Sequence, residues 1–146
     1  MKALVVYDST YSNTEKIAKS IGGALTGDVK VLRAADVNPA EFNSFDLLVI
    51  GSPTNGGRPL PSIAKLLNNI PETVIKGKNV AVFDTRFSSK MAKIFGYAAD
   101  RIAKNLKDKG ANLVVPAEAF FVTGKEGPLK DGELERAAAW AKTLVK

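Results

Sequence analysis

The chain has 146 residues, a formal net charge of +6 at pH 7, and neither cysteine nor histidine. The lack of cysteine excludes disulfides, thiolate catalysis and cysteine-bound metals, and the lack of histidine removes the commonest general base and metal ligand at neutral pH. The length predicts a single domain over residues 1–146, with 45% hydrophobic and 25% charged content that is ordinary for a soluble protein. The first apolar run, residues 3–7, is too short for a secretion signal, and no segment approaches the roughly 20 apolar residues that span a bilayer. We therefore expect a cytoplasmic protein.

Apolar runs and segments of helical periodicity alternate along the chain. The runs predict five strands, at residues 3–7, 29–32, 46–51, 79–84 and 113–122, the last interrupted or bent at Pro116. Helical spacing and end signals predict five helices, at residues 13–25, 39–42, 61–68, 88–109 and 133–145. This alternation predicts parallel pairing, right-handed crossovers and a three-layer α/β sandwich.

Ligands of such sheets bind outside the carboxyl ends of the strands, where the strand order switches. The loops after the first, third and fourth strands are therefore the candidate functional segments. They read DSTYSNT at residues 8–14, GSPTNGGRP at 51–59 and DTRFSSK at 84–90.

The first of these loops crowds hydroxyl groups in front of a helix. Hydroxyl and amide side chains, free backbone N–H groups and the helix dipole together bind a phosphate without a cation. The same loop contains a capping box, Ser12 to Glu15, which needs no ligand. A cap does not account for the neighbouring hydroxyls of Ser9, Thr10 and Thr14, and the residues alone leave both interpretations open.

The first strand followed by STYSNTE, residues 9–15, resembles the phosphate loop of flavodoxins, whose usual form is S/T-x-T-G-N-T-E. The loops after the third and fourth strands fall where that family holds the isoalloxazine ring of FMN. The resemblance covers essentially the whole chain in length and element order, and the fifth strand without an extra segment resembles the short-chain branch. It implies a doubly wound, flavodoxin-like fold with a five-stranded parallel sheet in the order 2-1-3-4-5. It also implies non-covalently bound FMN.

The resemblance assigns two groups of residues to the cofactor. The phosphate would be bound by Ser9, Thr10, Tyr11, Ser12, Asn13 and Thr14. The ring would be held by Pro53, Thr54, Asn55, Gly56, Gly57, Arg58, Thr85, Arg86, Phe87, Ser88 and Ser89. The protein would then be an electron carrier between redox partners, with no acid, base or nucleophile of its own, because the cofactor supplies the chemistry.

The sequence departs from the flavodoxin pattern in two ways: the side chains of the phosphate loop are larger, and fewer aromatic residues are available to stack on the flavin. Tyr11 and Ser12 replace the usual Thr and Gly of the phosphate loop. Flavodoxins typically stack a Trp and a Tyr on the flavin, but the second loop here has no aromatic residue and the third offers only Phe87. Because an aromatic contact contributes roughly 0.5–1.5 kcal/mol, we expect weaker flavin binding. Phe87 has an alternative place in the core, at the start of the long helix.

Two glycines follow Asn55 in the second loop. The resemblance implies that a glycine peptide at Gly56 or Gly57 flips beside flavin N5 on reduction and stabilises the semiquinone, since glycine tolerates positive φ. A plain turn is the alternative, because Asn-Gly-Gly also suits one.

The basic charge is another departure, because flavodoxins are usually acidic. Candidate cations near the ring are Arg58, Arg86, Lys90 and Lys125. Positive charge should stabilise the anionic reduced flavin, so we expect a less negative second reduction potential than in a typical flavodoxin. The alternative is that these side chains lie at a solvated rim of the site, where water screens their charge from the flavin. Either way, a basic surface suggests redox partners with acidic docking surfaces.

Two other functions stay open on the sequence. One is a small NAD(P)H-dependent FMN or quinone reductase on the same fold, and the other is a flavin-free flavodoxin-like interaction module. A dinucleotide-binding loop is disfavoured because G-x-G-x-x-G is missing after the first strand, and Gly51-Ser52-Pro53 stands where a phosphoryl-receiver domain needs an Asp. Nucleic-acid binding would rest on charge alone. We expect a monomer that binds no nucleic acid or membrane.

Overall fold

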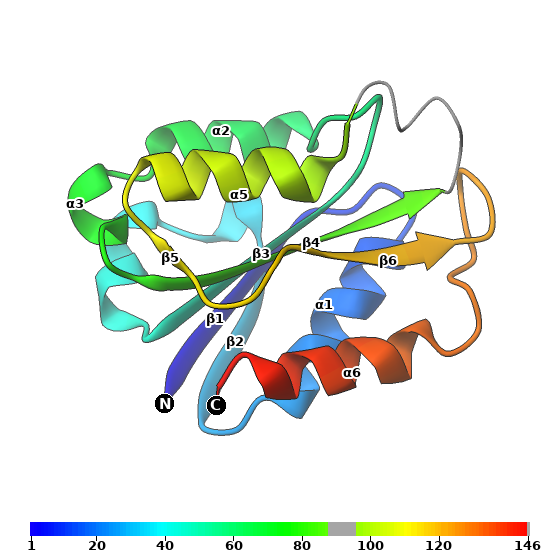
Figure 1. The fold of residues 1–146 in the computed structure, drawn as a ribbon, viewed down its shortest axis with the longest axis horizontal. Coiled ribbons are helices and arrows are strands. Elements are labelled where there is room, and N and C mark those ends of the chain that lie inside the picture. Colours follow the sequence, from blue (N-terminus) through cyan, green and yellow to red (C-terminus); the bar gives the residue numbers. More distant parts are fainter. Residues whose placement is uncertain (88–95, 146) are drawn as a thin grey trace.

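A computed structural model describes residues 1–87 and 96–145, and its centre is a parallel sheet between two layers of helices (Figure 1). The strands are β1 (Lys2–Tyr7), β2 (Asp28–Arg33), β3 (Leu47–Pro53), β4 (Asn79–Phe87), β5 (Asn112–Leu113) and β6 (Glu118–Val122). They pair in the order β2-β1-β3-β4-β5, with β6 also beside β4. This confirms the predicted flavodoxin-like fold and its strand order.

The fifth strand position holds two separate pieces, which is why the sheet has six strands rather than five. Both pieces pair in parallel with β4, first Val80 with Leu113 and then Phe83 with Glu118. The chain takes five residue steps between Leu113 and Glu118 while β4 takes three. The extra residues make room for Pro116, which cannot donate to a strand ladder. The predicted interruption is confirmed.

Helices α1 (Asn13–Ala24) and α6 (Glu133–Thr143) cover one face of the sheet. Helices α2 (Pro61–Asn69), α3 (Glu72–Ile75) and α5 (Ala98–Asp108) lie on the other face, with the 3-10 turns η1 (Ala34–Asp36) and η2 (Pro39–Ser44). Alternate residues of each strand enter opposite cores. In β1, Leu4 and Val6 face α2 and α5, whereas Val5 faces α1 and α6.

The core beneath α1 and α6 is built around three aromatic rings. Phe83, Phe120 and Trp140 meet edge to face, with ring centroids 5.9–6.2 Å apart, a favoured aromatic geometry. Phe83 also fills the space beside Gly51, where a Cβ would lie 2.0 Å from its ring. The small residue at the end of β3 is therefore a packing requirement.

The long helix predicted after β4 is not continuous. The sequence predicts one helix over residues 88–109, but α5 begins at Ala98. Gly96 has a φ of +83° and Tyr97 is extended, with φ −138°, so neither continues a helix. Residues 88–95 lie outside the described part of the chain.

The short helices follow local signals only in part. Asn38 accepts a hydrogen bond from the Ala40 N–H at 3.1 Å, as expected for the cap of the turn at Pro39. The turn continues to Ser44, and η1 and α3 were not predicted.

Candidate cofactor-binding site

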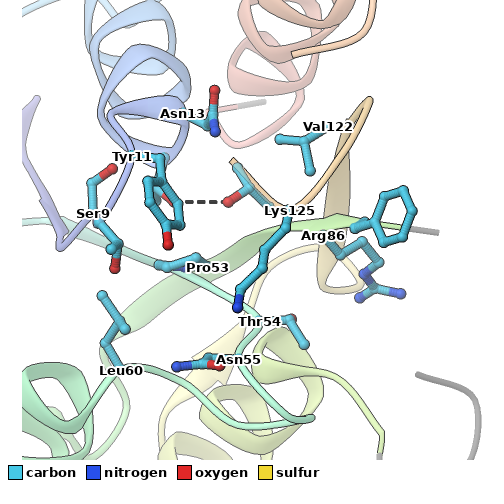
Figure 2. Close-up of a pocket in the computed structure, with 14 residues that line it drawn as sticks. Ser9, Tyr11, Asn13, Pro53, Thr54, Asn55, Leu60, Arg86, Val122 and Lys125 are labelled. Atoms are coloured by element: carbon cyan, nitrogen blue, oxygen red, sulfur yellow. Dashed lines mark hydrogen bonds between the residues drawn. The ribbon is translucent and has the colours of Figure 1, made fainter. Parts of the chain in front are cut away.

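The carboxyl ends of β1, β3 and β4 meet at one edge of the sheet, and a pocket of about 460 Å³ opens between their loops (Figure 2). Its volume is in the range of small-molecule sites. The pocket is lined by Ser9, Thr10, Tyr11, Asn13, Thr14, Pro53, Thr54, Asn55, Leu60, Thr85, Arg86, Phe87, Val122 and Lys125. The three loops singled out by the α/β rule therefore share a single concave surface.

Most of the residues assigned to the cofactor line this pocket, but not all of them. Among the described residues, the exceptions are Ser12, Gly56, Gly57 and Arg58. Ser88 and Ser89, like the candidate cation Lys90, lie outside the described residues. Leu60 and Val122 line the pocket without having been predicted, and Lys125 lines it although it was expected only as a nearby cation.

The capping box is not formed. Ser12 has a φ of +70° and, within the described part of the chain, its side chain makes no cap hydrogen bond to α1. Glu15 instead accepts a hydrogen bond from the Tyr7 hydroxyl at 2.7 Å and pairs with Arg33. The hydrogen bond from Tyr7 lowers the pKa of Glu15 below its usual value. The interpretation of the loop as a plain helix cap is therefore wrong.

Ser12 takes the position where flavodoxins usually have glycine, and its backbone has the conformation that glycine favours. It is the one non-glycine residue with positive φ in the described chain. A side chain in that conformation costs about 1–2 kcal/mol. Strain of this kind is typical of functional loops that their surroundings hold in shape.

An unsatisfied hydroxyl marks the inner end of the loop. The Ser9 Oγ is buried and has no hydrogen-bond partner among the described residues. Buried polar groups are normally paired, and the uncapped first turn of α1 adds further free N–H groups beside it. These are the donors that a phosphate would need.

A charged network holds this loop from behind. Asp8 accepts hydrogen bonds from the Ser9 N–H at 2.8 Å and from Arg33 at 2.9 Å, and its other oxygen accepts from the Ser62 hydroxyl at the start of α2. Arg33 comes from the end of β2 and also reaches Glu15. The network ties three elements to the start of the loop, so the position of Ser9 depends on tertiary contacts.

The first turn of α1 and the end of β4 are joined beside the pocket. The Thr14 and Thr85 hydroxyls lie 2.7 Å apart, and both residues are buried. When Thr85 donates to Thr14, the hydrogen of the Thr14 hydroxyl is left for a ligand.

Strand β4 runs to Phe87 rather than ending at residue 84 as predicted, and its last part contains an ion pair that the sequence did not reveal. Asp84 is fully buried and accepts two hydrogen bonds from Arg86, at 2.8 and 2.9 Å. It also accepts from the Thr54 hydroxyl and from the Ala99 N–H at the start of α5. Arg86 stacks over Tyr97, 3.4 Å from the ring centroid. The charge of Arg86 is therefore compensated by Asp84.

The second loop is a tight hairpin turn. Asn55 and Arg58 exchange two backbone hydrogen bonds, and the residues between them, Gly56 and Gly57, have φ values of +58° and +81°. Such a turn needs positive φ at both central positions. Arg101 of α5 donates to the Gly57 carbonyl at 2.8 Å. The plain-turn interpretation thus accounts for both glycines, and the redox-linked flip stays a prediction.

Two exposed aromatic side chains stand at the pocket. Tyr11 is 43% exposed and Phe87 is 48% exposed, and both line the pocket. The alternative that Phe87 belongs to the core is therefore wrong.

The residues present fit FMN. A hydroxyl-rich loop with the unpaired Ser9 hydroxyl lies on one side of the pocket, and the rest of the lining combines apolar and aromatic side chains with polar and basic ones. In the described part of the chain there is no group of acidic side chains that could hold a metal ion, and no described helix is long and apolar enough to cross a membrane.

The fold and site together define a doubly wound α/β protein with a pocket at the carboxyl ends of its central strands. A family model described as flavodoxin matches residues 5–140, so the chain belongs to the flavodoxin family. Members of this family bind FMN and transfer electrons to redox partners.

Individual relatives agree with this assignment. A flavodoxin of Maridesulfovibrio salexigens is 29% identical over 151 residues, which cover 99% of this chain and 97% of that protein. A flavodoxin from the domain Archaea superposes with a TM-score of 0.84 at 26% identity, over 99% of this chain and 96% of the other. Oxidised flavodoxin 1 from Bacillus cereus, at 19% identity and TM-score 0.81 over 99% and 97% of the two chains, shares the fold.

Proposed function

We propose that this chain binds FMN non-covalently in the pocket and carries electrons between redox proteins. The observation that carries the proposal is the first loop, where the buried Ser9 hydroxyl has no partner among the described residues and the following helix is left uncapped. The phosphate would lie there, and the ring would lie between the loops that hold Thr54 and Thr85.

The residues of the first loop act on the phosphate as hydrogen-bond donors. Ser9, Thr10 and Thr14 donate from their hydroxyls, and the backbone N–H groups of the first turn of α1 add donors and positive potential. Tyr11, Ser12 and Asn13 complete the loop around the phosphate. When bound, the flavin itself supplies reversible electron uptake, so the chain needs no acid or base.

The ring would be held by a sparse set of side chains. Tyr11 and Phe87 contribute aromatic surface, while Pro53, Leu60 and Val122 contribute apolar surface. With no aromatic residue in the second loop, we expect FMN to bind more weakly than in a flavodoxin with two stacked rings. Of the other assigned residues, Thr54, Asn55, Gly56, Gly57, Arg58 and Arg86 would hold the second loop and the end of β4 in shape around the ring.

The partners of this carrier would dock through charge. A net charge of +6 favours proteins with acidic surfaces around their own redox centres, because opposite charge speeds encounter without a large interface. A single-domain monomer in the cytoplasm suits such transient docking.

Absorbance spectra test the proposal directly. The purified protein is mixed with FMN or with riboflavin, which lacks the phosphate, and excess ligand is removed by gel filtration. We expect flavin bands in proportion to protein after FMN and much weaker bands after riboflavin. Equal retention of both ligands would contradict the phosphate site, and retention of neither would favour a flavin-free module. Rapid NAD(P)H oxidation by the FMN-loaded protein alone would favour a reductase.

A further inference from the structure

Four cations were expected near the ring, and of the three that the structure describes, one is placed to act on the cofactor. Arg86 is paired with the buried carboxylate of Asp84. Arg58 is exposed and does not line the pocket, and Lys90 lies outside the described residues. Lys125 lines the pocket, and in Figure 2 its side chain reaches across the pocket toward the loop of Thr54 and Asn55.

Lys125 is carried by a hairpin with its own hydrogen bonds. After β6, the Thr123 N–H donates to the Pro128 carbonyl at 2.8 Å, and the Gly127 N–H donates to the Gly124 carbonyl at 3.1 Å. Val122 and Leu129 pair across the base of this turn. The short closed tip restricts where the amino group of Lys125 can go.

The hairpin is also latched onto the first loop. The Asn13 side chain donates to the Glu126 carbonyl at 3.2 Å. Gly127 packs so closely against Asn13 that a Cβ there would lie 2.7 Å from the amide oxygen and nitrogen. Asn13 of the first loop therefore also positions the hairpin that carries Lys125. The neighbouring Glu126 does not line the pocket, so its carboxylate does not offset the lysine there.

We propose that Lys125 is a cofactor-binding residue that holds a positive charge beside the ring and favours reduced FMN over oxidised FMN. This inference rests on the proposed function. Two electrons from a reductant and one proton from solvent convert the neutral oxidised ring into a reduced ring with one negative charge. The Lys125 ammonium attracts that product more than the neutral reactant, so it raises the two-electron midpoint potential.

The size of the effect follows from Coulomb's law. A unit charge about 6 Å from the ring, in a partly exposed site of effective dielectric constant about 40, changes the ratio of reduced to oxidised affinity by about tenfold. For a two-electron couple a tenfold ratio corresponds to about 30 mV. High salt reduces the effect, because the site is open to solvent.

The test is a redox titration of FMN-loaded protein with dithionite and a reference dye. Lys125→Gln is compared with Lys130→Gln, a control on the same hairpin whose amino group lies over Phe121, 5.7 Å from the ring centroid, and does not line the pocket. We expect the first variant to lower the midpoint by about 30 mV and the control to leave it unchanged. Lys125→Arg should keep the midpoint of the unaltered protein.

Equal midpoints for the two glutamine variants overturn the role of Lys125 while leaving the proposed function intact. Failure of the unaltered protein to bind FMN overturns both. Gly127→Ala tests the latch, because its Cβ would displace the Asn13 amide from the hairpin and because the φ of +99° at this position disfavours alanine. We expect it to lower the midpoint with Lys125 still present, and an unchanged midpoint would overturn the positioning by Asn13.

Discussion

Replacing Asp84 with asparagine removes a charge that the fold has buried beside the pocket. Asp84 is 0% exposed, and its Arg86 partner is 15% exposed. The substitution leaves the partly buried guanidinium uncompensated, and it turns one acceptor oxygen into a donor that faces the Arg86 or Ala99 N–H groups. Breaking a buried pair in this way costs about 3–5 kcal/mol.

The assay is urea unfolding followed by circular dichroism. A loss of about 3 kcal/mol moves the midpoint by about 1–3 M urea, since the slope for a small domain is about 1–3 kcal/mol per molar. The matched control is Asp108→Asn, which removes an exposed pair with Lys104 (2.7 Å) and should cost at most about 1 kcal/mol.

A double variant separates the ion pair from the other contacts of Asp84. Adding Arg86→Gln to Asp84→Asn removes the uncompensated charge, so the double variant should be more stable than Asp84→Asn alone. If Asp84→Asn costs no more than Asp108→Asn, the reasoning about the buried pair is refuted.

Three further predictions follow from the same structure. Ser12→Gly relieves the φ of +70° and should stabilise the protein by about 0.5–1 kcal/mol in thermal unfolding, after the entropy cost of glycine; a lower melting temperature would contradict the strain. Glu15 and Glu133 both have pKa values below the usual one, through hydrogen bonds from Tyr7 and Arg136 respectively. The contribution of these two carboxylates to the free energy of unfolding should be complete above the unfolded-state pKa of about 4.3 and lost as pH falls through the lower folded-state values. Glu133→Gln should therefore make the free energy of unfolding depend less on pH on the acid side. An unchanged pH dependence would exclude this contribution. Tyr11→Leu should weaken FMN binding by about 2- to 12-fold, corresponding to one lost aromatic contact, as measured by fluorescence titration; an unchanged affinity would place Tyr11 away from the flavin.

The strands could be predicted from the sequence more fully than the conformations of the loops. The three-layer α/β architecture and the three candidate loops follow from alternating apolar runs, because continuous apolar segments between amphipathic helices have few other ways to bury both faces. The strand order was implied by the resemblance to flavodoxins. The interrupted fifth strand was also predictable, since Pro116 lacks the N–H that a ladder needs.

The first loop shows where local signals mislead. Ser12 and Glu15 have the spacing of a capping box, and an isolated helix would use it. In the folded protein, Tyr7 from β1 and Arg33 from β2 compete for the Glu15 carboxylate and win. The same competition leaves the helix N-terminus open for a ligand.

The sequence by itself determined the α/β layers and the edge of the sheet where a ligand is expected, because these depend on periodicity and on neighbours along the chain. The phosphate-loop resemblance implied the doubly wound strand order. The tertiary structure alone decided which charged side chains line the pocket and which are paired. Asp84 neutralises Arg86 only because α5 begins at Ala98 and closes over the pair. Lys125 reaches the site only because a hairpin after β6 is latched to Asn13, 112 positions before the lysine in sequence order. Electrostatic effect depends on distance and burial, and neither is encoded in the local order of residues.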